Sequence, residues 1–208
     1  MINLSPPRFF QNFFPNVIWN FPSETDGVFL TFDDGPTRDV TPWVLEQLKK
    51  YNAKATFFCL AKNVEMNPDI YKQILADGHS VGNHSYSHIK GWSTDTSQYM
   101  QDIIYANSFI KSNLFRPPYG RITPRQLLLL RHRYKIILWD VLSMDYSKRV
   151  SPRKVANYVL NNVHPGAIVV FHDSVKAQRN LKYALPRVLE GITEKGLILK
   201  PIVIDDKK

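Results

Sequence analysis

The sequence contains a single cysteine and no long apolar run. One thiol, Cys59, cannot form an intramolecular disulfide, so the chain does not require an oxidising compartment. Its position in the apolar run ATFFCLA favours a buried, unreactive thiol over a nucleophile. No stretch approaches the roughly 18 apolar residues of a membrane-spanning helix, so we expect no transmembrane segment.

Blocks of like charge are also missing. The chain has 27 basic and 18 acidic residues and a net charge of +9, but Lys and Arg are scattered along it. Scattered charge is typical of a solvated surface, and the alternative is a basic face that binds an anionic polymer or lipid headgroup. Zinc-finger spacing, a basic helix and RNA-binding aromatic motifs are absent, so no nucleic-acid partner is expected.

Residues 1–26 lack the basic start and continuous apolar segment of a signal peptide. The stretch is aromatic but is interrupted by proline and asparagine. We expect it to cover a single domain spanning residues 1–208, with peripheral membrane contact through Phe and Trp as the alternative. A cytoplasmic location is expected from the missing export signal, and the cell envelope is the alternative.

Helix and strand patterns alternate along the chain. A capping residue followed by proline predicts helix starts at Thr41-Pro42, Asn67-Pro68, Thr123-Pro124 and Ser151-Pro152, and two further helices fit residues 96–111 and 179–195. Short apolar runs predict strands at 28–33, 54–60, 79–83, 113–116, 135–141, 167–172 and 198–204. This order predicts an α/β fold with a parallel sheet wrapped by helices, and about seven repeats can close into a barrel.

Two adjacent carboxylates, Asp33 and Asp34, end the apolar run VFLTFDD before a Gly35-Pro36 turn. Neighbouring strand residues point to opposite faces, so inside a sheet at least one of these charges would be cut off from water. At the end of a strand both can open into a cleft, where α/β proteins build their sites.

A histidine pair follows the third predicted strand in the run NHSYSH. His84 and His88 are four residues apart and would share one face of a helical turn, a spacing that lets two imidazoles bind one metal. The alternative is a surface or structural pair. A carboxylate from Asp33 or Asp34 would complete a set of three ligands with open positions for water.

Three more polar residues follow later strands. Arg116 precedes two prolines in FRPPYG and is either a solvated arginine or a guanidinium that orients a carboxylate. Asp145 and His172 follow the next two strands. A histidine at a strand end is a candidate proton donor when it has a carboxylate partner and a core residue otherwise.

The runs TFDDGP, HSYSH, RPPYG, SMDY and VVFHD, in this order over nearly the whole chain, resemble the five motifs of the NodB-type polysaccharide deacetylases, carbohydrate esterase family four. The resemblance implies a distorted (β/α)7 barrel of the NodB homology type. It also implies metal-dependent removal of acetyl groups from N-acetylated sugars of a polysaccharide of the chitooligosaccharide or peptidoglycan type.

The resemblance assigns different roles to the two adjacent carboxylates. Asp33 would be the general base. Asp34, His84 and His88 would hold one divalent metal, most often zinc, with cobalt, nickel or manganese as alternatives. Attack by a metal-bound water needs one carboxylate on the metal and another left free beside the water, which accounts for two adjacent acids.

Further roles follow from the same resemblance. Arg116 would hold Asp33 ionised, and the backbone N–H of Tyr119 would stabilise the oxyanion. His172 would be the general acid, because an amide's amine leaves poorly until it is protonated. Asp145 would orient His172.

The expected substrate pocket includes Pro118, Tyr146 and Val170. In the fourth motif the family often has D-S-x-D-W, whereas this chain has LSMDY, so that Leu142 replaces the first acid and Tyr146 the tryptophan. These departures bear on substrate shape more than on reaction type, and the Tyr146 hydroxyl needs a hydrogen-bond partner.

Two other functions compete with glycan deacetylation. One is deformylation or deacylation of a sugar-lipid headgroup, which a basic face and an aromatic N-terminus would suit. The other is glycan binding without catalysis by a degenerate barrel. The expected partner is an N-acetylated glycan, and the expected oligomeric state is a monomer.

Overall fold

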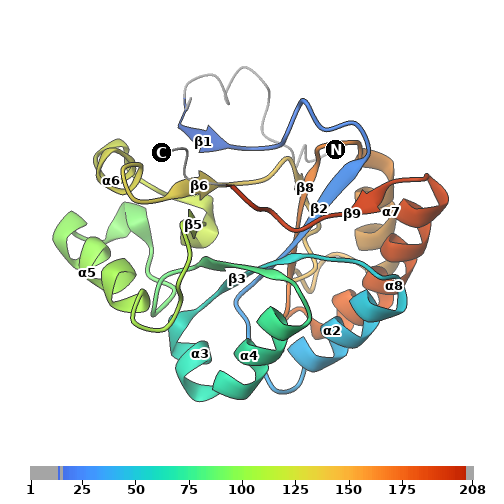
Figure 1. Cartoon of the computed structure of the whole chain (residues 1–208), viewed down its shortest axis with the longest axis horizontal. Helices are drawn as coiled ribbons and strands as arrows, with labels where there is room; N and C mark the ends of the chain where they lie inside the picture. Colours follow the sequence, from blue (N-terminus) through green and yellow to red (C-terminus); the bar gives the residue numbers. More distant parts are fainter. Residues whose placement is uncertain (1–13, 15, 205–208) are drawn as a thin grey trace.

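The computed structural model describes Phe14 and residues 16–204, which form a parallel sheet curved into an open barrel with helices outside it (Figure 1). Its strand order is β1-β6-β5-β4-β3-β2-β8-β7, and β9 pairs with β2. The strands are β1 (Val17–Ile18), β2 (Gly27–Asp33), β3 (Thr56–Cys59), β4 (Ser80–Asn83), β5 (Leu114–Phe115), β6 (Lys135–Ile137), β7 (Val141–Leu142), β8 (Ile168–His172) and β9 (Ile198–Leu199). The expected distorted (β/α)7 barrel of the NodB type is confirmed.

All four proline-marked helix starts are confirmed. The helices are α2 (Thr41–Lys50), α3 (Ala61–Met66), α4 (Pro68–Ala76), α5 (Thr96–Ala106), α6 (Pro124–Leu130), α7 (Pro152–Asn162) and α8 (Gln178–Glu194), with short 3-10 turns η1 (Gly91–Ser93) and η2 (Pro118–Gly120). The side chains of Thr123 and Ser151 accept the first free N–H groups of their helices. Thr41 is no cap, since it lies inside α2, where its hydroxyl donates to Asp173 at 2.5 Å.

The predicted strand over 135–141 is wrong as one element. It divides into β6 and β7, because Leu138 N–H donates to Ile18 whereas Asp140 N–H donates to Ile168. The chain thus changes partner strand within three residues. The sequence did not predict helix α3 and strand β1, because both are too short to show a hydrophobic periodicity.

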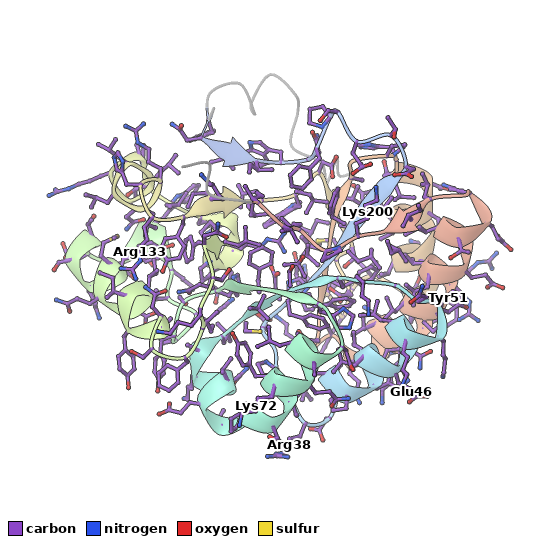
Figure 2. The ribbon with its side chains drawn as sticks, in the orientation of Figure 1. Arg38, Glu46, Tyr51, Lys72, Arg133 and Lys200 are labelled. Atoms are coloured by element: carbon purple, nitrogen blue, oxygen red, sulfur yellow. The ribbon has the colours of Figure 1, made fainter. Side chains whose placement is uncertain are left out.

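The expected N-terminal cover, residues 1–26, falls in part on residues 1–13 and 15, which lie outside the described residues. Within the described part, Val17 and Ile18 pair in parallel with Ile136 and Ile137 as an edge strand. Among the described helices, none has the length and apolar character needed to cross a bilayer. Charged side chains such as Arg38 and Glu46 lie beyond the helices at the outer surface (Figure 2).

Strand β2 supplies both the core and the floor of the site. All seven of its residues are buried. Val28, Leu30 and Phe32 pack against the helices, whereas Phe29 packs with Ile137 and Ile168 in a separate cluster. Because strand side chains alternate, Asp33 shares its face with Phe29 and points into the barrel.

Candidate functional site

A cleft over the carboxyl ends of β2, β4 and β8 gathers the polar residues that the sequence singled out. Asp33, Asp34, His84, His88 and His172 all line it. Register brings two of them together, since Asp33 and His172 are paired positions on the neighbouring strands β2 and β8.

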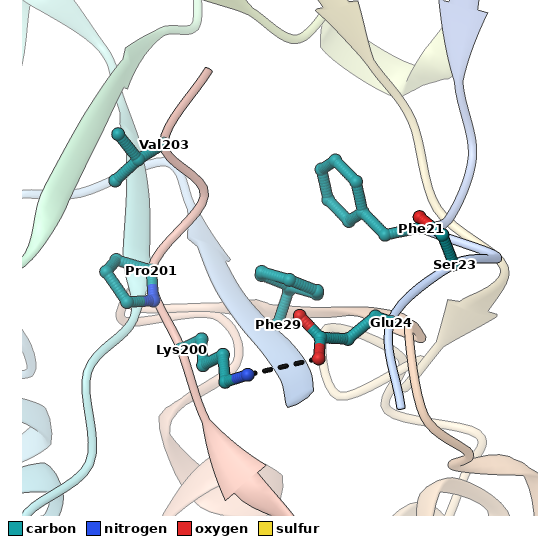
Figure 3. A pocket seen from close by; sticks show the side chains of 7 residues that line it. All are labelled: Phe21, Ser23, Glu24, Phe29, Lys200, Pro201 and Val203. Carbon is teal, nitrogen blue, oxygen red and sulfur yellow. Dashed lines mark hydrogen bonds and ion pairs between the residues drawn. The ribbon is translucent and has the colours of Figure 1, made fainter. Parts of the chain in front are cut away.

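A second hollow, near the start of β2, has a different chemical character (Figure 3). Phe21, Phe29 and Val203 line it, and its charged residues Lys200 and Glu24 form an ion pair with a 3.0 Å N–O distance. It contains no histidine, whereas three histidines line the first cleft.

Asp33 is almost fully buried and relies on Arg116 rather than water. Arg116 is itself completely buried, and its Nη1 donates to Asp33 Oδ1 at 2.7 Å and to Thr31 Oγ1 at 2.6 Å. Backbone carbonyls of Ile137 and Leu138 accept its other N–H groups. A buried charge pair needs this degree of hydrogen bonding to be tolerated, and the solvated alternative for Arg116 is wrong.

Asp34 turns away from Asp33 because the strand ends there. Its φ of 78° lies in the left-handed region, and the following Gly35 packs so closely that an added Cβ would lie 2.0 Å from the Asp173 carboxylate. The Asp34 side chain consequently faces the histidines, with Oδ1 at 3.2 Å from His88 Nε2 and 3.8 Å from His84 Nε2.

The two histidines meet in an irregular loop, and the expected helical turn is wrong. Ser85 and His88 have φ of 68° and 60°, and the Ser85 hydroxyl accepts a hydrogen bond from the His88 N–H at 3.0 Å. Asp102 on α5 accepts hydrogen bonds from the Tyr86 N–H and the Ser87 hydroxyl. The imidazole centroids lie 5.2 Å apart. Sequence reasoning missed Asp102, which lies a whole helix away and carries no local signal.

His84 is arranged to present an unprotonated nitrogen. Burial lowers its pKa to about 4, against the opposing charge of Asp33, so the ring is neutral at neutral pH. Its Nδ1 lies 2.7 Å from the Arg116 carbonyl, which can only accept, and the ring proton is therefore assigned to Nδ1. The free Nε2 lone pair then points toward Asp34.

Asp34, His84 and His88 form a set that fits a divalent ion. One ligand atom of each lies within 4.8 Å of the others. Burial opposes ionisation of Asp34, but the nearby imidazoles of His88 and His172 hold its pKa well below the usual range. Its buried Oδ1 accepts no hydrogen bond from a described residue. An ionised oxygen without a donor beside two imidazoles is the ligand set of a transition-type metal.

His172 and Asp145 form a second histidine–carboxylate unit. His172 Nδ1 lies 2.8 Å from Asp145 Oδ1, and the His172 backbone N–H donates to Oδ2 at 2.8 Å. Burial disfavours the charged ring, but the charge and hydrogen bond of Asp145 outweigh it and raise the pKa of His172 to about 9. Asn180 on α8, which the sequence did not single out, donates to the Asp145 carbonyl and fixes this loop.

The walls of the cleft are largely aromatic. Tyr119, Tyr146 and Val170 line it, whereas Pro118 is buried in η2 and is not among the lining residues. The hydroxyl of Tyr146 finds its partner in the Met144 sulfur at 3.0 Å. Leu142 and Trp139 also line the cleft. Sequence reasoning missed Trp139, because the predicted strand over 135–141 ran through it, whereas β6 ends at Ile137.

Asp173 holds the backbone at the end of β2, and the sequence did not predict it as a site residue. Its carboxylate accepts hydrogen bonds from the Gly35 N–H and the Thr41 hydroxyl, and its own N–H donates to the Asp33 carbonyl. Burial raises its pKa to about 7. Asp173 thus holds the turn on which the two site carboxylates lie. Cys59, by contrast, is buried as expected.

Comparison with known proteins agrees with this arrangement. Residues 22–134, more than half of the chain, match the family model for polysaccharide deacetylase. A peptidoglycan-N-acetylglucosamine deacetylase of Bacillus cereus is 38% identical over 177 residues, which are 81% of this chain and 64% of that relative. The chain therefore spans less than two thirds of that relative's length.

Solved structures extend the match to the whole fold. A crystal structure of the Bc1960 peptidoglycan N-acetylglucosamine deacetylase, in complex with a hydroxamate (4-naphthalen-1-yl-N-oxidanyl-benzamide), superposes with a TM-score of 0.86 at 32% identity and covers 95% of both chains. A family-four pseudoenzyme from Bacillus anthracis superposes with a TM-score of 0.77 at 27% identity, covering 87% of this chain and 65% of its own. On its sequence match and its fold, the chain belongs to the polysaccharide deacetylase family.

Proposed function

We propose that this chain is a metal-dependent hydrolase that removes acetyl groups from N-acetylated sugars of a glycan polymer, with peptidoglycan as the favoured type. The observation that carries the proposal is the convergence on one cleft of a metal-type ligand set, a buried carboxylate and a protonated histidine. The names of the relatives support the glycan type, since they act on peptidoglycan N-acetyl groups.

Asp34, His84 and His88 would hold the ion. Bound there, a divalent metal would polarise the acetyl carbonyl and make a water molecule more acidic. Nitrogen and oxygen ligands suit zinc, and they also admit cobalt, nickel or manganese. The neutral state of His84 favours binding because imidazole coordinates through a free lone pair.

Asp33 would act as the general base. The Arg116 guanidinium donates a hydrogen bond to its carboxylate at 2.7 Å, and this contact fixes its direction toward the cleft. Adjacent placement on the chain puts this base beside the ligand Asp34 without making it a ligand. Asp33 would take a proton from water as the water attacks the amide carbonyl.

His172 would be the general acid. A pKa of about 9 keeps the imidazolium protonated at neutral pH, as is required of a group that must deliver a proton to the departing amine. Asp145 would bind Nδ1 and leave the other ring nitrogen for proton transfer. His172 on β8 is in register with Asp33 on β2, so the proposed donor and base would act from neighbouring strands.

The remaining lining residues would position the acetamido group. The Tyr119 backbone N–H would donate to the developing oxyanion, and the rigid Pro117-Pro118 segment supports that backbone. Tyr146 and Val170 would enclose the acetyl methyl group, together with Leu142.

An acetate-release assay tests the proposal. Purified protein supplied with zinc is incubated with peptidoglycan and with chitooligosaccharides, and acetate and formate are both quantified. We expect acetate release that requires the metal, and its loss in His172→Ala. Formate released from a formylated sugar-lipid without acetate from any glycan would favour the deformylase alternative. Glycan binding with no release at all would place the chain with the non-catalytic members of its family.

A further inference from the structure

Three cations form the rim of the cleft, and they are not needed for the chemistry proposed above. Lys90, Arg121 and Lys176 are exposed residues that line the cleft. The acidic lining residues among the described part of the chain are Asp33 and Asp34, which face Arg116 and the histidine pair. The parts of a substrate that extend beyond the acetamido group would therefore meet only positively charged side chains among these charged lining residues.

Each rim cation lies over an aromatic ring. Lys90 Nζ lies 5.4 Å from the Tyr119 ring centre, and Lys176 Nζ lies 5.4 Å from that of Tyr146. The Arg121 guanidinium lies 5.1 Å from the Trp92 ring. These contacts hold the charged heads in place without neutralising them, because a ring face carries no net charge.

Some other surface cations among the described residues are paired with acids. Arg38, Lys50 and Lys200 each form an ion pair with a carboxylate within 3.3 Å. None of the three rim cations forms an ion pair with a described carboxylate. Their charge is thus left available to a ligand.

Two of the rings that carry rim cations contact histidines of the site edge-on. The Tyr119 ring lies 4.5 Å from that of His88, and the Tyr146 ring lies 4.9 Å from that of His172. Lys90 and Lys176 are consequently one aromatic ring away from the two ends of the site. A sugar next to the one being hydrolysed would lie within reach of such a cation.

Trp92, which holds Arg121, offers a flat exposed surface. The residue is 65% exposed, and its Nε1 donates to the Ile122 carbonyl at 3.1 Å, which fixes the ring. An immobilised, exposed indole is suited to packing against the apolar face of a sugar ring. Arg121 stacked on it would face the substituents of that sugar.

We propose, on the basis of the proposed function, that the rim cations Lys90, Arg121 and Lys176 select glycans with a carboxylate on the sugars flanking the acetamido group that is cleaved. The lactyl carboxylate of a muramic acid unit is such a group, whereas a chitooligosaccharide is neutral. Three cations over three separate rings fit well-spaced single carboxylates. A phosphate group would instead call for several donors converging on one point.

Initial-rate measurements with three tetrasaccharides test this inference. They are a muramic-acid-containing tetrasaccharide with free lactyl carboxylates, the same molecule with these groups converted to methylamides, and chitotetraose. Zinc-loaded wild type, Arg121→Gln and Lys176→Gln are compared. Arg187→Gln is the matched control, because Arg187 also stacks on a tyrosine, Tyr183, but does not line the cleft.

We expect wild type to favour the free-acid tetrasaccharide over its methylamide through a KM that is lower by about two- to fivefold, as exposed charge pairs provide. Arg121→Gln and Lys176→Gln should each reduce that preference and change kcat/KM on chitotetraose by a smaller factor. Added salt should weaken the preference of wild type, because screening acts on exposed charges. Arg187→Gln should behave as wild type.

Equal KM values for the acid and the methylamide in wild type would overturn the inference while leaving deacetylation intact. A parallel loss on chitotetraose in the rim variants would also overturn it, since it would show a general structural role. If no tetrasaccharide releases acetate, the proposed function fails. Calorimetric binding of the free-acid tetrasaccharide to wild type and Arg121→Gln then decides the inference separately, with equal affinities counting against it.

Discussion

His84 and His172 lie at the carboxyl ends of β4 and β8 in one cleft, but they are held in opposite states. Burial lowers the pKa of His84 to about 4, whereas the pKa of His172 rises to about 9. His84 therefore carries a free lone pair at neutral pH, and His172 carries a positive charge.

The difference comes from the atom that faces each Nδ1. A neutral backbone carbonyl, that of Arg116, faces His84 and gives it no charge to offset burial. The Asp145 carboxylate faces the Nδ1 of His172 and also accepts a hydrogen bond from the His172 backbone N–H. The partner of Nδ1 thus acts together with burial and the charges of Asp33 and Asp34 to set whether a histidine is suited to bind a metal or to donate a proton.

The largest expected effect comes from removing one of the proposed metal ligands. His88→Ala should lower metal affinity by about 10²-fold or more, because one of three protein ligands is lost. His172→Ala should lose acetate release to a similar degree but keep its metal, since it lies outside the ligand set. Metal analysis of both variants after gel filtration, alongside the acetate assay, separates the two histidines. Equal metal content in His88→Ala and wild type would contradict the ligand assignment.

The next largest effect concerns Asp33, which lies between the two histidine units. Asp33→Asn should keep the metal and reduce kcat by about 10²- to 10⁴-fold, the range for loss of a general base. Asp34→Asn is the control, and it should lose the metal together with the activity. If the outcomes are exchanged between the two variants, the roles of the adjacent carboxylates are reversed.

The sequence predicted the strands and the residues at their ends well, because both depend on local patterns. Asp33, His84 and His172 end up in one cleft because parallel strands bring their carboxyl ends to one edge of the barrel. The proline-marked helix starts were equally accessible, since proline and its preceding residue act within one turn.

Residues that act over long sequence distances could not be predicted. Asp102, Asp173 and Asn180 shape the site through hydrogen bonds to loops far away in the chain, and no periodicity marks them. The loop carrying His84 and His88 was expected to be helical because spacing of four fits a helical turn. Instead, the left-handed backbone conformations of Ser85 and His88 bring the two imidazoles close together.

A smaller effect is expected from weakening the partner of His172. Asp145→Asn should lower the pKa of His172, so the basic limb of the kcat/KM profile should move to lower pH from a position near 9. The maximum should fall on the order of tenfold, because the ring is still present but less well held. Leu142→Ala is the control, as its apolar side chain supplies no charge to His172. A limb that stays in place in Asp145→Asn would mean that another group tunes the donor.

The smallest effect is on the free energy of unfolding, measured by urea denaturation as a function of pH. The pKa of His172 is about 9 in the folded chain, above the value of 6.5 for an unperturbed histidine. The folded state then binds one more proton than the unfolded state between these pH values. The stabilisation that comes from protonation of His172 is fully present below pH 6.5 and is lost as pH rises through about 9.

The clean window for this measurement lies above pH 7, because the buried Asp173, with a pKa of about 7, also binds its proton more tightly in the folded state. A chelator removes metal, so that ligand protonation at His84 and His88 does not add a metal-dependent slope. Between about pH 7 and 8 the free energy of unfolding of wild type should fall by about 1 kcal/mol per pH unit, and His172→Gln should remove most of that slope. Leu142→Ala should retain it. At higher pH the thiol of Cys59 adds to the slope, because burial raises its pKa in the folded chain. If His172→Gln follows the wild-type slope, then His172 is not charged in the folded chain, and the contrast with His84 does not hold.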